Sequence, residues 1–184
     1  AVRRSASGGR FIAGGAMWSP VAVYRAMGGY APQFFLYVDD TDFSVRASAR
    51  GYVLDVVPEA LLTHLISAST GGAKVVSPIR LYYELRGSLL FWRRHLGFRA
   101  FHWRWCRAHL GKWMCQLPFW WEHEDHRAKA EAVADALWYL ISHSSDSTGR
   151  PQSPRWFRTA LSRRPWIVGA LMGFDLRALL GRAR

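Results

Sequence analysis

The chain has 184 residues, 50% of them apolar and 21% charged, so it can bury the core of one ordinary domain and is not disordered as a whole. Its formal net charge of +12 favours anionic partners such as nucleic acid, acidic lipid or a phosphorylated substrate. Two cysteines are too few for a disulfide framework, which favours a reducing compartment, and no apolar run approaches the roughly 18 residues that span a bilayer.

The charge is distributed unevenly along the chain. Residues 1–77 carry seven basic and five acidic side chains, whereas the remaining residues carry 18 basic and eight acidic ones. Nine of the ten tryptophans also lie in this second, basic part. We therefore expect two parts with different roles, residues 1–76 and residues 77–184.

The first part alternates short apolar segments with Gly, Pro and Ser, which is typical of short helices and strands. Ser19-Pro20 starts a helix in the usual way, and Gly28-Gly29 ends it. The segments that follow predict a buried strand over Phe34–Val38, a helix over Thr41–Arg50, a strand over Tyr52–Val57 and a short strand over Leu61–Leu65. Because helices and strands alternate, we predict an α/β fold for this part.

Three carboxylates, those of Asp39, Asp40 and Asp42, directly follow the predicted strand over Phe34–Val38. Like charges this close repel one another, so a fold keeps them only where a cation, a proton or a helix N-terminus offsets the repulsion. Asp42 is placed for an ion pair with Arg46 one helical turn later. For Asp39 and Asp40 the residues alone leave two interpretations open, a catalytic pair in a cleft or a helix cap at a solvated strand end.

The second part is predicted to be helical. Ser77-Pro78 starts a long helix over Ile79–Leu96, whereas residues 98–121 mix Trp, Phe, Arg and His without a clear period. The segments beyond are a helix over Arg127–His143, a polar linker over Ser144–Pro154 and a basic amphipathic helix over Pro165–Arg182.

Several short motifs follow one another at characteristic spacing between residues 10 and 97. They are Gly15-Ala16-Met17, Met27-Gly28-Gly29-Tyr30, Phe34–Asp42, Gly51-Tyr52, Val57–Ala60, His64, and Ser77-Pro78 through Tyr82-Tyr83-Glu84 to Phe91. In order and spacing this set resembles the bacterial inverting glycosyltransferases of family 2, which include rhamnosyltransferase-like enzymes. The resemblance implies the C-terminal part of a GT-A domain over residues 1–76, followed by an α-helical extension over residues 77–184.

The resemblance also implies roles for two groups of residues. Asp39-Asp40 stands where the family has Glu-Asp, which makes Asp40 the catalytic base and Asp39 its acidic neighbour at the sugar. Such a carboxylate takes the proton of an acceptor hydroxyl while that hydroxyl attacks the anomeric carbon with inversion. The backbone of Gly15, Ala16 and Met17 is expected to bind substrate near the sugar.

A divalent cation, Mg²⁺ or Mn²⁺, is the cofactor that the resemblance implies, because it offsets charge on the leaving diphosphate. The position of His64 can reach this metal in family members, although a lone histidine between leucines is also typical of a packed core. The D-x-D pattern over Asp40–Asp42 follows the Gly15–Met17 block and so matches the base motif, not the family's metal motif. We therefore expect the metal motif and the nucleotide-binding half to lie outside this chain, which is then inactive alone.

The expected partners are a nucleotide-diphosphate sugar donor and a glycan or lipid-linked acceptor of cell-surface polysaccharide synthesis. Arg and Trp together suit the headgroup layer, and the enzymes that the chain resembles often act on lipid-linked acceptors. The resemblance thus implies a cytoplasmic protein peripheral to the inner face of the plasma membrane. No recognised nucleic-acid motif is present, so nucleic acid is not expected as a partner. Two alternatives stay open: helices that merely pack on the catalytic part, and a non-catalytic basic module that binds anionic membrane or nucleic acid.

Overall fold

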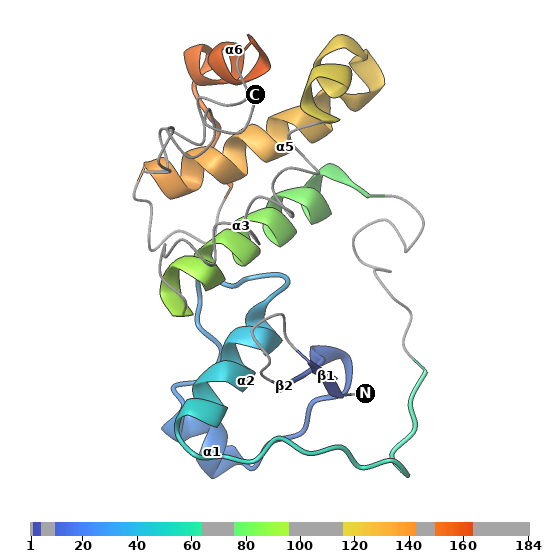
Figure 1. The fold of residues 1–184 in the computed structure, drawn as a ribbon, viewed down its shortest axis with the longest axis vertical. Helices are drawn as coiled ribbons and strands as arrows, with labels where there is room; N and C mark the ends of the chain where they lie inside the picture. The colour runs from blue at the N-terminus through green and yellow to red at the C-terminus, as the bar shows by residue number, and fades with distance from the viewer. Residues whose placement is uncertain (1, 5–9, 64–75, 96–115, 143–149, 164–184) are drawn as a thin grey trace, which may run out of the picture. The chain divides into compact units, whose positions relative to one another are not determined.

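The computed structural model describes residues 2–4, 10–63, 76–95, 116–142 and 150–163 (Figure 1). The chain divides into two compact units, Ala1–Val75 (unit 1) and Val76–Arg184 (unit 2), and the boundary expected from sequence falls between residues 76 and 77. Within the described residues, no helix combines the length and the apolar character that crossing a bilayer requires.

The predicted α/β fold of GT-A type is wrong. The described residues are mostly helical, and the sheet among them is a two-stranded antiparallel ribbon of β1 (Val2–Arg4) and β2 (Arg10–Ile12). A doubly covered parallel sheet needs several long apolar strands. The part of the chain that the structure describes contains none of them.

The run over Phe34–Val38, predicted as a buried strand, is a bend. Phe34 is buried but Phe35 is exposed, and Tyr37 and Val38 take left-handed backbone angles, with φ of 62° and 67°. Strand backbone requires a strongly negative φ, so the ladder cannot continue through these two residues. The chain instead enters α2 (Asp39–Ala49) directly, and the three carboxylates lie in the first helical turn and not at a strand end.

The two other predicted strands are also absent where the structure describes them. Residues 52–57 and 61–63 belong to no helix or strand. Residues 64 and 65 lie outside the described part of the chain. Val53, Val57, Leu61 and Leu62 are exposed, so the apolar character that predicted these strands does not place them in a core.

Unit 1 is built from α1 (Val21–Ala26), α2 and β2. Its core joins the end of α1 to one face of α2 through Met27, Phe43 and Ala47. Four partly buried side chains pack around this core, those of Met17, Val23, Tyr30 and Leu54. The helix predicted from Ser19-Pro20 to Gly28-Gly29 is thus confirmed, although Pro20 and not Ser19 occupies the N-cap position.

Arg46 ties α2 to the end of α1. Its Nε donates to Oδ2 of the buried Asp42 at 2.8 Å, which confirms the predicted ion pair. The two terminal nitrogens donate to the carbonyls of Met27 and Gly29 at 2.7 and 2.8 Å. Because the last carbonyls of a helix have no partner within it, this guanidinium satisfies groups that would otherwise be orphaned.

Unit 2 contains α3 (Pro78–His95), α5 (Glu124–Ile141) and α6 (Arg155–Arg163), and residues 116–122 are helical as well. α3 packs along α5, and α6 packs on α5 (Figure 1). The first two helices were predicted, with α5 beginning three residues earlier than Arg127. α6 was not predicted, and the expected helix over Pro165–Arg182 lies outside the described residues.

A buried arginine lies between α3 and α5. The Arg86 guanidinium stands 3.9 Å from the ring centroid of Tyr139, and the Tyr82 and Tyr83 rings lie within 5.9 Å of it. Such cation–π contacts partly replace the hydration that a buried charge loses. Burial raises the pKa of Tyr82 to about 12, so this neighbour stays neutral at physiological pH.

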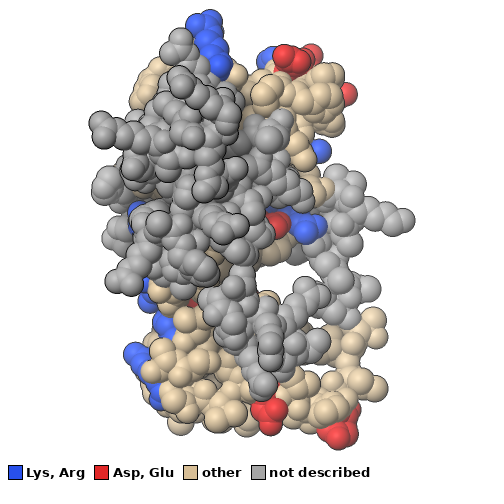
Figure 2. Space-filling view, viewed as in Figure 1, with Lys and Arg blue, Asp and Glu red and all other residues tan. Residues whose placement is uncertain are grey.

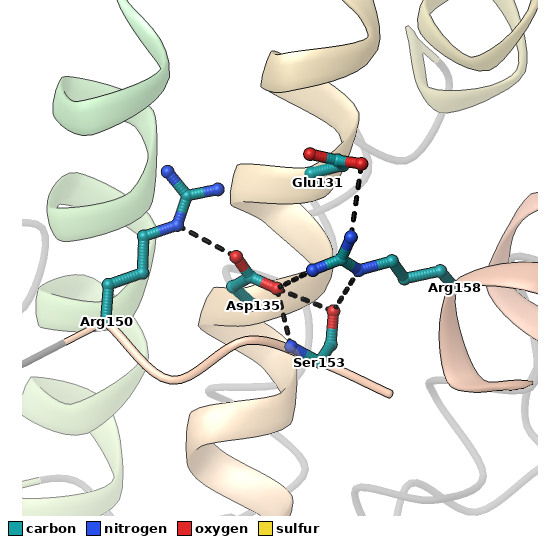
Figure 3. Close-up of polar contacts among 5 residues, drawn as sticks. All are labelled: Glu131, Asp135, Arg150, Ser153 and Arg158. Atoms are coloured by element: carbon teal, nitrogen blue, oxygen red, sulfur yellow. Dashed lines mark hydrogen bonds and ion pairs between the residues drawn. The ribbon is translucent and has the colours of Figure 1, made fainter. Parts of the chain in front are cut away.

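Asp135 of α5 holds the segment that leads into α6 (Figure 3). Its Oδ1 accepts hydrogen bonds from the backbone N–H and the hydroxyl of Ser153, at 2.8 and 2.6 Å. Oδ2 pairs with Arg150 Nε at 2.8 Å, and Arg158 Nη2 lies 3.3 Å from Oδ1. Because Asp135 is buried, its charge is tolerable only with these partners in place.

We expect Asp135→Asn to lower the free energy of unfolding by about 3 kcal/mol, because Arg150 loses its ion-pair partner and Arg158 loses the buried one of its two partners. Glu131→Gln is the matched control: Glu131 also pairs with Arg158, at 3.1 Å, but is partly exposed, and should cost less than about 1 kcal/mol. Urea unfolding followed by circular dichroism measures both values. Equal losses for the two variants would contradict the special role of Asp135.

Candidate functional site

The candidate site lies where the Gly14–Ala16 turn (η1) meets the first turn of α2. The backbone N–H of Gly14 donates to Asp40 Oδ2 at 2.7 Å, across 26 residues of sequence. A Cβ added at Gly14 would stand 3.2 Å from the Asp40 Cβ, a tight contact, so glycine favours this close approach. The contact joins the segment that contains Gly15, Ala16 and Met17 to the predicted base.

Asp40 is held in one orientation by its other oxygen as well. Oδ1 accepts hydrogen bonds from the backbone N–H of Thr41 at 2.6 Å and from its hydroxyl at 3.1 Å. A carboxylate offers about four lone-pair positions on its two oxygens. Three are used by Gly14 and Thr41, which leaves about one acceptor position, on Oδ2, for a ligand hydroxyl.

Asp39 has a raised pKa. Burial raises its pKa, and the negative charge of Asp40 adds to this effect, whereas the backbone N–H groups of residues 39 and 40 act in the opposite direction. Both carboxylates lie in the first turn of α2, where the helix end favours negative charge. Hydrogen bonds from Gly14 and Thr41 anchor Asp40, whereas Asp39 holds its proton more tightly than a free aspartic acid does.

Asp42 does not belong to the site. Its side chain is fully buried and pairs with Arg46, so its carboxylate is turned into unit 1. This outcome agrees with the structural role predicted for Asp42. Because Arg46 neutralises Asp42, the repulsion among the three neighbouring carboxylates is reduced.

The substrate-binding residues expected from sequence differ in exposure. Gly15 and Ala16 are exposed in the turn, whereas Met17 is partly buried against the core of unit 1. Sequence reasoning missed Tyr30 as a site residue, although it ends one of the matching motifs. Its hydroxyl lies 4.0 Å from the Met17 sulfur, and burial together with the charge of Asp39 raises its pKa, so Tyr30 remains a neutral hydroxyl beside the acids.

His64, the expected metal contact, lies outside the described residues. Within residues 2–4, 10–63, 76–95, 116–142 and 150–163, no three His, Cys, Asp or Glu side chains gather so as to hold a metal ion. Asp39 and Asp40 are two carboxylates, and most acceptor positions of Asp40 are already used. These two groups alone do not fit a divalent cation, which takes about six ligands.

No protein-family model, curated protein or solved structure matches the chain.

Asp39 should make the chain less stable as the pH rises through acidic values. Its pKa is raised in the folded state, so the folded state keeps the proton at pH values where the unfolded chain, with a pKa near 3.8, has lost it. The contribution is complete below 3.8 and is lost as the pH rises through the raised pKa. We expect Asp39→Asn to flatten this part of the stability profile, measured as urea midpoints.

The control for this measurement is Glu59→Gln, which removes an exposed carboxylate of unit 1 outside the site. It should leave the wild-type slope in place. Parallel profiles for the wild type and Asp39→Asn would show that Asp39 is not the group responsible.

Proposed function

We propose that the chain contributes the base and the acceptor side of an inverting glycosyltransferase that acts in cell-surface polysaccharide synthesis. The observation that carries the proposal is the 2.7 Å hydrogen bond from Gly14 to Asp40. It brings together two segments that the sequence motifs associate with one active centre, the Gly15–Met17 block and the Asp39–Asp40 pair. The proposal depends on this site and not on the fold, because one chemistry can recur on unrelated folds.

In the proposed reaction Asp40 accepts a proton through the acceptor position left on Oδ2. The acceptor hydroxyl gives up this proton while its oxygen forms a bond to the anomeric carbon of the donor sugar. The bond from that carbon to the diphosphate breaks on the opposite face, so the nucleoside diphosphate leaves with the electron pair and the configuration inverts. The hydrogen bonds from Gly14 and Thr41 fix the direction in which the carboxylate faces the hydroxyl.

The surroundings of Asp40 suit a sugar substrate. Gly15 and Ala16 carry almost no side chain, so a sugar can approach the backbone of the turn. Asp39, half-buried beside Asp40, and the neutral hydroxyl of Tyr30 offer hydrogen-bonding groups for sugar hydroxyls. An apolar body with a few polar groups is typical of small-ligand sites, and Met17 supplies part of that body here.

The donor and its cation are proposed to depend on residues beyond the described ones. Mg²⁺ or Mn²⁺ would offset the charge of the leaving diphosphate, with His64 as a candidate contact. The proton transfer to Asp40 is a property of unit 1 and does not require this ion. A lipid-linked acceptor would place the protein on the inner face of the plasma membrane, which is the location that we propose.

Asp40→Asn should abolish sugar transfer in the full-length protein that carries this sequence, by about 100-fold or more, because the amide cannot take the proton. The assay follows radiolabelled sugar from dTDP-rhamnose or UDP-glucose into a membrane fraction with Mg²⁺ or Mn²⁺ present. Asp55→Asn, which changes an exposed carboxylate of unit 1 outside the matching motifs, is the control and should retain wild-type transfer. Full transfer by Asp40→Asn would rule out the proposal.

A further inference from the structure

α6 presents two different faces. Phe157 and Leu161 are buried and face the rest of unit 2, whereas Arg155, Trp156, Thr159 and Arg163 are exposed. At 100° per residue these four exposed positions fall within an arc of about 100° on one side of the helix. We call them the α6 face. Basic side chains project from the region of α6 in the space-filling view (Figure 2).

Trp156 is the prominent side chain of the α6 face. It is 62% exposed, although large aromatic residues are usually well buried. Its ring meets Trp138 of α5 edge to face, with centroids 5.6 Å apart, and Phe157 lies 5.8 Å away at a similar angle. One side of the indole therefore packs against α5, while much of the ring remains exposed and can contact a partner.

The charge of the α6 face is purely basic. α6 contains three arginines and no acid, but Arg158 is drawn toward Glu131 and Asp135 and so lies off this face. Neither Arg155 nor Arg163 takes part in an ion pair among the described residues. The face thus combines one exposed indole with two guanidinium groups that are available to anions.

We infer that the α6 face rests on the surface of an anionic lipid bilayer. An indole has an apolar body and a polar N–H, which suits the boundary between headgroups and acyl chains, and arginines beside it pair with lipid phosphates. Nucleic acid fits less well, because single strands need successive stacking platforms along a basic groove and this face offers one ring. This inference identifies the part of the chain that makes the membrane contact proposed above. The contact does not depend on the transfer reaction at Asp40.

The contacts between α6 and α5 hold the α6 face toward solvent. Asp135 fixes Ser153 and Arg158, one just before α6 and one within it, so the helix is anchored on the side opposite to the solvent. A short helix held in this way can place Trp156 against a surface without first having to fold there. The ordering cost that weakens binding by disordered segments is thereby reduced.

The interaction is measured by sedimenting the full chain with sucrose-loaded vesicles. The vesicles consist of phosphatidylcholine with either about 30% phosphatidylglycerol or none, so that they differ in negative charge. We expect Arg155→Gln and Arg163→Gln each to weaken binding to anionic vesicles about fivefold. Trp156→Ala should weaken it several-fold, and more salt should reduce the effect of the arginines. Circular dichroism confirms that each variant remains folded.

Two matched controls lie in unit 1. Trp18→Ala removes a tryptophan that is 82% exposed, and Arg25→Gln removes an exposed arginine of α1; both should bind vesicles as the wild type does. Asp40→Asn should also bind normally, so loss of transfer and loss of membrane contact are separable. Trp156→Phe adds a second readout, because it should lower the quenching of protein fluorescence by brominated lipid.

Three outcomes would overturn the inference. One is unchanged vesicle binding by the α6 variants, and another is an equal loss in the unit 1 controls. The third is a loss of binding to a fluorescent oligonucleotide by the α6 variants with vesicle binding intact, which would make nucleic acid the partner.

Discussion

The ion pair between Asp42 and Arg46 is the constraint on which the candidate site depends. Asp42 is fully buried, and Arg46 joins it to the carbonyls of Met27 and Gly29 at the end of α1. A buried carboxylate without such a partner would be strongly unfavourable, so the rotation of α2 about its axis is fixed by this pair. With Asp42 turned inward, the first turn of α2 leaves Asp39 and Asp40 near the surface beside the Gly14–Ala16 turn.

Periodic patterns located the long helices, and apolar composition misplaced the strands. α3 was predicted because Leu81, Leu85, Leu89 and Trp92 fall on one helical face, and α5 was predicted over Arg127–His143. A short apolar run has no such period, so Phe34–Val38 was taken as a strand although the structure turns there. α6 escaped prediction because nine residues with two buried side chains, Phe157 and Leu161, give too weak a signal.

The candidate site was only partly predictable. The sequence identified Asp39, Asp40 and the Gly15–Met17 block, and it separated Asp42 from them through its spacing to Arg46. The hydrogen bond that brings Gly14 to Asp40 crosses 26 residues, and no local pattern specifies such a pairing. A tertiary contact depends on how α1, α2 and β2 pack together, and that packing is set by the whole core of unit 1.

The left-handed backbone at Tyr37 and Val38 has a consequence for the stability of unit 1. A β-branched residue such as Val38 is poorly suited to a positive φ, which costs of order 1–3 kcal/mol and which glycine would adopt freely. A glycine directly before Asp39 would therefore avoid this cost. Valine restricts the backbone at this position more than glycine would. The orientation of Asp39 and Asp40 is therefore set by a strained turn and not by a flexible one.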